Sequence, residues 1–190
     1  MKSSTFSAVG KAYRDREAAF RRVSGLSGDA LRLSKRAIFA MHRDDLKDAK
    51  RLLVEAAAQF SACEAVIKKF RGLEEEGMYH AALEEYAEAL LFLSYLETGK
   101  FGKLETRAMR PSVYLGGLSD ATGELVRHAV RRATEGDRGE VERAYAVSSS
   151  VVAFLLDLDL TGNLRTKFDQ AKKNLRTLEQ MRYELSLQSR

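Results

Sequence analysis

Apolar residues recur at alternating spacings of three and four along most of this chain, and most clearly between residues 45 and 71. In that stretch the pattern places eight residues on one helix face, namely Leu46, Ala49, Leu53, Ala56, Phe60, Cys63, Ile67 and Phe70. No window shows the alternation of apolar and polar residues that is typical of a strand. The chain also has one proline and many good helix formers. The sequence therefore predicts an all-α fold.

The breakers between the periodic stretches predict about seven helices within a single domain over residues 1–190. The predicted helices cover residues 4–24, 31–43, 45–71, 78–98, 111–134, 140–159 and the stretch from 164 onward. The cluster Ser24–Gly28 is either a turn or a weak point in one long helix. Phe6, Val9, Tyr13 and Phe20 are candidate buried positions of the first helix. Asp44-Asp45 mark the start of the third, and a short turn of helix is expected at residues 103–109. Several helices are about 30–35 Å long and bury only one face within so short a chain, so we expect an oligomer.

Charge and cysteine content narrow the class of protein. The net charge is +5, which favours an anionic partner, although both signs are interspersed. Cys63 is the only cysteine, which excludes an intrachain disulfide and fits a reducing compartment. The first twenty residues contain no apolar core typical of a signal peptide, and the longest uncharged run is too short to cross a bilayer. We expect a cytoplasmic protein that does not bind membranes.

The stretch Tyr114–His128, just after Pro111, departs from the rules of a stable helix. Asp120 and Glu124 are four residues apart, so two like charges repel on one helix face. Three glycines inside the stretch each cost about 1 kcal/mol relative to alanine, and these are Gly116, Gly117 and Gly123. A segment that accepts both penalties is a candidate functional site.

A second pair of carboxylates lies on the predicted helix 78–98. Glu85 and Glu88 share a face with Phe92 and Tyr95, and a purely solvated face would rarely end in two aromatic residues. If this face packs against the face of Asp120 and Glu124, four carboxylates gather, and they cannot all stay ionised at close range without a partner. Hard oxygen ligands of this kind suit Mg²⁺ or Mn²⁺.

Several stretches carry a resemblance to one family. Tyr114–Arg127 resembles the signature of the translin family, and Ser34–Arg43 is similar to its early basic helix. Asn163–Asp169, together with Tyr183–Ser186, resembles its C-terminal helix, so the likeness spans nearly the whole chain. Two local motifs resemble the branch of translin-associated factor X, and these are Glu85-Tyr-Ala-Glu88-Ala89 and Asp120-Ala-Thr-Gly-Glu124-Leu125.

The resemblance implies a translin-like bundle that assembles into a closed, hollow oligomer, either of one chain type or with a translin-like subunit. The factor X branch implies a Mg²⁺-dependent endoribonuclease that cuts short single-stranded RNA inside the oligomer. The metal ligands would then be Glu85, Glu88 and Asp120, with Glu124 as a fourth ligand or as a general base. A divalent ion bound there would activate water for phosphodiester hydrolysis.

Basic residues near these acids are candidate contacts for a single-stranded RNA or DNA backbone. Arg127 and Arg131 continue the stripe of Glu124, and a basic patch in the early helix includes Lys35, Arg36, His42 and Arg43. Each feature also has a plain structural interpretation. The arginines can pair with neighbouring glutamates, part of the patch can pack inside the fold, and glutamate pairs at helical spacing are usually solvated surface. The pair Gly116 and Gly117 can equally mark tight helix packing, and His80 and His128 are expected to be ordinary polar residues.

Other classes fit the residues less well. A ferritin-like di-iron bundle needs Glu-x-x-His pairs, but Glu88 and Arg127 stand at those positions. The chain has no glycine-rich phosphate loop and no order of residues typical of a Ser–His–Asp nucleophile. The main alternative is a non-catalytic oligomer that binds single-stranded RNA or DNA, as translin does. A purely structural bundle is the third possibility. Asp120 together with Glu85 and Glu88 distinguishes the enzyme, because binding alone does not require three such acids.

Overall fold

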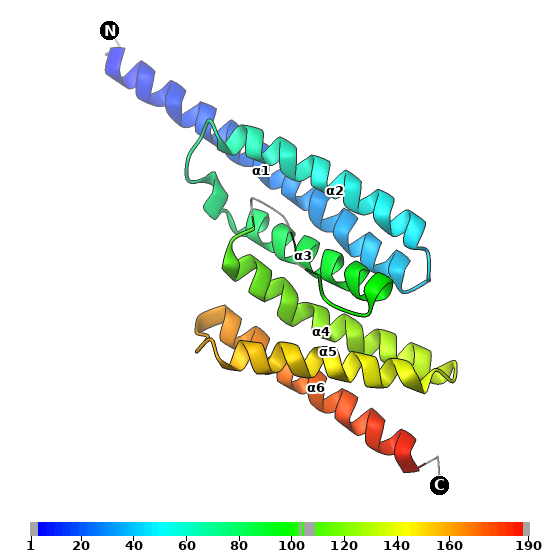
Figure 1. The fold of residues 1–190 in the computed structure, drawn as a ribbon. Helices are drawn as coiled ribbons and strands as arrows, with labels where there is room; N and C mark the ends of the chain where they lie inside the picture. Colours follow the sequence, from blue (N-terminus) through cyan, green and yellow to red (C-terminus); the bar gives the residue numbers. More distant parts are fainter. Residues whose placement is uncertain (1–3, 103, 105–108, 188–190) are drawn as a thin grey trace. The chain divides into compact units, whose positions relative to one another are not determined.

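The computed structural model describes residues 4–102, 104 and 109–187, and every described element is helical (Figure 1). The all-α prediction is therefore confirmed for this part of the chain. The elements, in order, are α1 (Ser4–Met41), α2 (Leu46–Ile67), the 3₁₀-helix η1 (Leu73–Glu75), α3 (Gly77–Thr98), α4 (Pro111–Thr134), α5 (Arg138–Leu156) and α6 (Gly162–Leu187).

These elements form two compact units, which are described separately below. The first contains residues 1–40 and 45–86, and the second contains residues 41–44 and 87–190, so α3 contributes to both. The single domain predicted over residues 1–190 stays a prediction. A short helix expected near residues 103–109 lies mostly outside the described residues.

In the first unit, α1 runs without a break through Ser24–Gly28, where the sequence left a turn or a weak point open. The expected pair of helices is therefore one, and the described residues hold six α-helices instead of about seven. Contacts with α2 explain the continuity. The buried Ser27 hydroxyl lies 3.7 Å from the Cys63 sulfur, which also lies 3.8 Å from the Val23 carbonyl oxygen. Packing of this kind outweighs the weak helix propensity of the glycines.

The N-terminal part of α1 differs from the prediction in a second respect. Phe6, Val9 and Tyr13 were expected to be buried, but all three are exposed within this chain. The expectation was wrong because periodicity identifies an apolar face without showing whether another element of the same chain covers it.

Local signals set the starts of three helices. Asp45 caps α2, since its carboxylate accepts a hydrogen bond of 3.0 Å from the Asp48 amide. Asp137 caps α5 in the same way through the Glu140 amide, at 3.2 Å. Pro111 occupies the first turn of α4, where its missing N–H costs nothing. The start expected at Asp44-Asp45 and the helix expected after Pro111 are confirmed.

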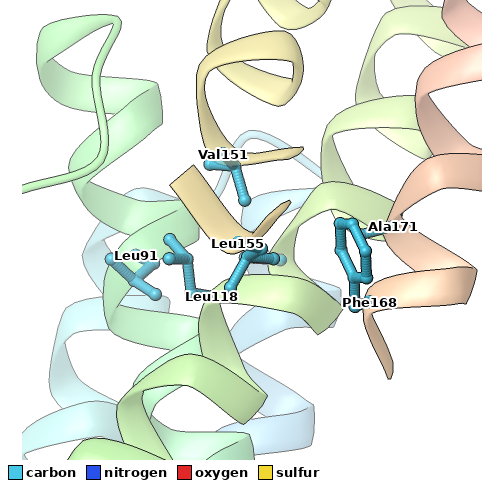
Figure 2. Close-up of a cluster of buried hydrophobic side chains, with 7 residues drawn as sticks. Leu91, Leu118, Val151, Leu155, Phe168 and Ala171 are labelled. Carbon is cyan, nitrogen blue, oxygen red and sulfur yellow. The ribbon is translucent and has the colours of Figure 1, made fainter. Parts of the chain in front are cut away.

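The second unit has an apolar core between α3, α4, α5 and α6. Figure 2 shows its members, which are Leu91, Leu118, Ala121, Val151, Leu155, Phe168 and Ala171. They come from all four helices, and each is largely shielded from solvent. Burial of these side chains is the main favourable term that holds α4, α5 and α6 together.

Small residues let α4 approach its neighbours closely. Gly116 and Gly117 are both buried, which favours the packing interpretation of this glycine pair. A Cβ on Gly123 would lie 3.4 Å from the Asn174 amide nitrogen of α6. That nitrogen donates a hydrogen bond of 2.9 Å to the Thr122 hydroxyl, which in turn donates to the Ser119 carbonyl at 2.7 Å. Gly123 therefore lies at a direct contact between α4 and α6.

Among the described helices, none has a stretch long and apolar enough to span a lipid bilayer.

Two adjacent leucines on α5 test the position of this core. Leu155 is 1% exposed and Leu156 is 63% exposed. Leu155→Ala should lower the free energy of unfolding by about 2–5 kcal/mol, because it leaves a cavity in the cluster. Leu156→Ala should change it by less than about 0.5 kcal/mol. Urea unfolding followed by circular dichroism, at one protein concentration for all variants, measures both values. Equal losses in the two variants would contradict this core.

Candidate functional site

Asp120 lies on α4, half-buried, and is held by a cation from α6. The Lys167 ammonium group donates a short hydrogen bond to the Asp120 Oδ2 atom. Lys167 is itself largely shielded from solvent, so the pair is only partly screened by water. Lys167 and Asp120 therefore form an ion pair between α6 and α4 within the second unit.

Glu124 lies one turn further along α4 and contacts the imidazole of His42. The His42 Nε2 atom forms a short hydrogen bond with the Glu124 Oε2 atom. The ring of His42 is buried, with its centroid 4.9 Å from that of Phe92. Arg131 donates to the main-chain carbonyl of His42. Contacts on the ring and on the backbone therefore fix the imidazole that faces Glu124.

Glu85 and Glu88 lie on α3 and are half-buried, so their helix face is not fully solvated. In the first unit, the Lys35 ammonium nitrogen lies 3.8 Å from the Glu85 Oε2 atom. Glu88 belongs to the second unit, as do Asp120 and Glu124. Within the described ranges, no three His, Cys, Asp or Glu side chains are grouped closely enough to hold a metal ion. The four-carboxylate cluster predicted from the sequence stays a prediction.

The donor chemistry of α4 nevertheless fits a hard divalent cation. Mg²⁺ commonly binds through one or two carboxylates and keeps several water ligands. Asp120 and Glu124 supply two carboxylates from the same helix face, partly shielded from water. A carboxylate has about four acceptor positions on its two oxygens, so a bond to Lys167 or His42 leaves acceptor capacity. These two residues can therefore serve as ligands without a change in the fold of α4.

The two arginines predicted to bind nucleic acid both make ion pairs within the second unit. The Arg127 guanidinium lies 4.0 Å from the Glu124 carboxylate. Arg131 pairs with Asp44 and with Glu135, the latter at 3.1 Å. The structural interpretation of these arginines therefore holds for the chain alone. Their role in nucleic-acid binding stays a prediction.

The other three predicted nucleic-acid contacts are on exposed surface. Lys35 and Arg36 lie on the solvent side of α1, and Arg43 lies in the turn that follows. His42 stands beside Arg43 but is buried, so it does not belong to the exposed part of the basic patch.

Asp44 ties the turn of residues 41–44 to the C-terminal end of α4. Its backbone is left-handed, with φ of 61°, a conformation that Asp tolerates better than most residues. The Arg131 guanidinium donates a hydrogen bond to its carboxylate, and Arg132 lies 3.2 Å from the second oxygen. These bonds lower the pKa of Asp44 below its ordinary range. The bonds from Arg131 and Arg132 therefore fix the turn of residues 41–44, which includes His42.

A buried polar network, which the sequence did not predict, lies between α3, α4 and α5. The Tyr95 hydroxyl donates to Glu140, and Arg143 donates two bonds to the same carboxylate, at 2.9 and 2.6 Å. The His128 Nε2 atom lies 3.6 Å from Glu140. Burial and the carboxylate both raise the pKa of Tyr95 above its ordinary range. The network therefore places a neutral hydroxyl against a buried carboxyl group inside the second unit.

His128 is buried in this network, and burial lowers the pKa of its imidazole below the ordinary value of 6.5. Glu140 acts in the opposite direction, while the charges of Arg132 and His42 add to the lowering. Desolvation is the largest cause, so the neutral imidazole is favoured in the fold. The sequence indicated an ordinary polar residue here, and no local pattern marked its burial against Glu140.

The sequence identified Asp120 and Glu124 as candidate site residues, but it did not identify the side chains that contact them. His42 was assigned to the basic patch, and Lys167 was not selected. They lie 82 and 47 residues from Glu124 and Asp120, a separation that helical spacing alone does not bridge. One signal was available for His42, because it follows the buried Ile38 by four residues, the spacing of one helix face.

Comparison with a protein-family model gives one match. The model described as the Translin family matches residues 20–189, which is most of the chain. None of the curated proteins compared matches the sequence.

Comparison with solved structures gives similar folds. The crystal structure of apo-NeC3PO has a TM-score of 0.85 and 23% identity, covering 95% of this chain and 96% of that one. A structure of an AfC3PO–duplex RNA complex has a TM-score of 0.86 and 21% identity, covering 96% and 97%. A crystal structure of AfC3PO has a TM-score of 0.84 and 22% identity, with the same coverage. At this identity the likeness establishes the fold, and it confirms the translin-like bundle.

His128 should make stability depend on pH. Its folded-state pKa is lowered, so the unfolded chain binds a proton first as pH falls below about 6.5. Its contribution to stability is complete above that value and declines towards the folded-state pKa. His128→Gln removes the titration and should reduce the loss of stability between about pH 7 and pH 5. Urea unfolding at both pH values measures the effect, with His80→Gln as the matched control. A loss in His128→Gln equal to that in the unaltered chain would contradict the assignment.

Proposed function

The chain belongs to the translin family, and from that membership and the geometry of α4 we propose that it is a Mg²⁺-dependent endoribonuclease of the factor X type. One observation carries the proposal. Asp120 and Glu124 stand one turn apart in the family signature, half-buried, and each is held by a cationic or imidazole partner from another segment. A carboxylate pair that served only solubility would not need such partners.

RNA is the proposed substrate for three reasons. The net charge of +5 favours a polyanion, and exposed basic residues lie on α1. A protein of the same fold, AfC3PO, has been solved with duplex RNA. We retain single-stranded RNA as the substrate, with Lys35, Arg36, Arg43, Arg127 and Arg131 as its proposed contacts. Single-stranded DNA and duplex RNA are the comparisons that an assay must include.

The assembly is part of the same proposal. We propose that the chain forms a closed homo-oligomer, or one completed by a translin-like subunit, in the cytoplasm. Exposed apolar residues on α1 supply surface that a second subunit would cover. Members of this surface include Phe6, Val9 and Tyr13.

Each proposed site residue has a separate role in phosphodiester hydrolysis. Asp120 would hold Mg²⁺ or Mn²⁺, with Glu85 and Glu88 completing the ligand set. Such an ion, when bound, polarises the phosphate and lowers the pKa of water. Glu124 either joins the ligands or accepts the proton from the attacking water, whose oxygen bonds to phosphorus as the P–O bond to the leaving nucleotide breaks. His42 would orient the Glu124 carboxylate, and Lys167 would orient the Asp120 carboxylate.

A non-catalytic RNA-binding oligomer is the second candidate. It is favoured by the ion pairs of Asp120 and Glu124, which satisfy both acids within the chain, and by the absence of a three-acid group among the described residues.

Asp120→Asn separates the two candidates, because it removes the charge and keeps the side-chain shape. With a labelled single-stranded RNA and Mg²⁺, the variant should cleave at least about 100-fold more slowly. Its RNA affinity in EDTA and its oligomeric mass by light scattering should not change. Asp169→Asn, an exposed acid on α6, is the control and should keep full activity.

Two outcomes would contradict the proposal. If cleavage continues unchanged in EDTA, or if Asp120→Asn retains full activity, the metal site is wrong. RNA binding with no cleavage by the unaltered chain would assign it to the second candidate.

A further inference from the structure

One exposed stripe of α1 combines basic residues with a single aromatic ring. Lys35 and Arg36 follow Arg32 by three and four residues and precede Phe39 by four and three. All four residues lie on the solvent side of α1, and we call them the Phe39 stripe. The stripe borders a surface hollow of about 460 Å³ between α1 and α2, which Asp29 and Gln59 also line. All of these residues belong to the first unit.

Phe39 is 52% exposed at the C-terminal end of this stripe. A single exposed apolar residue is ordinary on a protein surface. The surroundings of Phe39 distinguish it, because Arg32, Lys35 and Arg36 line the same hollow. Their positive charge matches the positive net charge of the whole chain. The one acid of the hollow, Asp29, already accepts a 2.6 Å bond from Arg32. The surface is therefore complementary to a polyanion that also carries flat apolar groups.

One residue of the Phe39 stripe lies next to Glu85, an acid of the proposed site. Lys35 lies one helical turn before Phe39, and its ammonium nitrogen is 3.8 Å from the Glu85 carboxylate. Both residues belong to the first unit, so this proximity does not depend on how the two units are arranged. A chain of nucleotides bound along the stripe would pass next to Glu85.

We propose that Phe39 is a stacking platform for an unpaired base of the bound RNA, with Lys35 and Arg36 contacting the phosphates on either side. Aromatic rings stack on any base, and cations placed along a groove track the backbone. A paired base has both faces covered by its neighbours in the helix, so this contact selects single strands. The proposal rests on the RNA-binding part of the proposed function and is independent of cleavage.

Fluorescence anisotropy with a labelled single-stranded RNA, in EDTA so that no cleavage occurs, measures the contact. Phe39→Ala should raise Kd by about 5- to 100-fold, the usual effect of losing one base–aromatic stack. Phe39→Trp should restore affinity, because tryptophan also stacks. Phe39→Leu should behave like alanine, because leucine keeps the apolar area but has no aromatic face.

Two further probes separate stacking from charge. On an oligonucleotide of the same length without bases, the unaltered chain and Phe39→Ala should bind equally. Changing the salt concentration should give the same slope for both proteins, because Phe39 neutralises no phosphate. Lys35→Ala and Arg36→Ala should each reduce the slope of log K against log salt by about 0.7.

Phe154→Ala is the matched control, since Phe154 is 47% exposed on α5, outside the Phe39 stripe, and its loss should not affect Kd. The inference is overturned if Phe39→Ala binds like the unaltered chain, if Phe39→Leu restores binding, or if the loss persists without bases. An altered oligomeric mass in Phe39→Ala would assign the ring to a subunit contact instead. If the unaltered chain binds no RNA, the proposed function itself has failed.

Discussion

The close contact between α4 and α6 is the constraint on which the candidate site depends. A Cβ on Gly123 would already touch Asn174, and the amide of Asn174 bonds to Thr122 on the same turn. This proximity lets Lys167 reach Asp120 across the two helices. Asp120, Thr122 and Gly123 thus all face α6. The weak helix propensity of the stretch is therefore the cost of placing a half-buried carboxylate in the fold.

A second set of contacts fixes the other acid of α4. Asp44 is held in a left-handed turn by Arg131 and Arg132, and Arg131 also binds the carbonyl of His42. The imidazole of His42 packs on Phe92 and bonds to Glu124. The arginines at the C-terminal end of α4 therefore help to position the partner of Glu124, which lies near the middle of the same helix. Arg131 and Arg132 of α4 therefore already make ion pairs within the chain.

Local sequence signals predicted what depends on neighbouring residues. The helical class, the cap at Asp45 and the start at Pro111 follow from spacing and backbone chemistry alone. Continuity of α1 through Ser24–Gly28 depends on burial against α2, which a local pattern does not report. The acids could be selected by spacing and by resemblance. Their partners could not, because Lys167 and His42 come from segments 47 and 82 residues away.

The central claim is that the acids of α4 and α3 together bind a divalent cation, and a crystal soaked in Mn²⁺ tests it most directly. Anomalous scattering identifies the ion, and its position names its ligands. The account predicts Mn²⁺ on the Asp120 carboxylate, with Glu85 and Glu88 among the remaining ligands. It would be contradicted if Mn²⁺ were bound away from Asp120, or if Asp120 remained paired with Lys167 alone at saturating Mn²⁺.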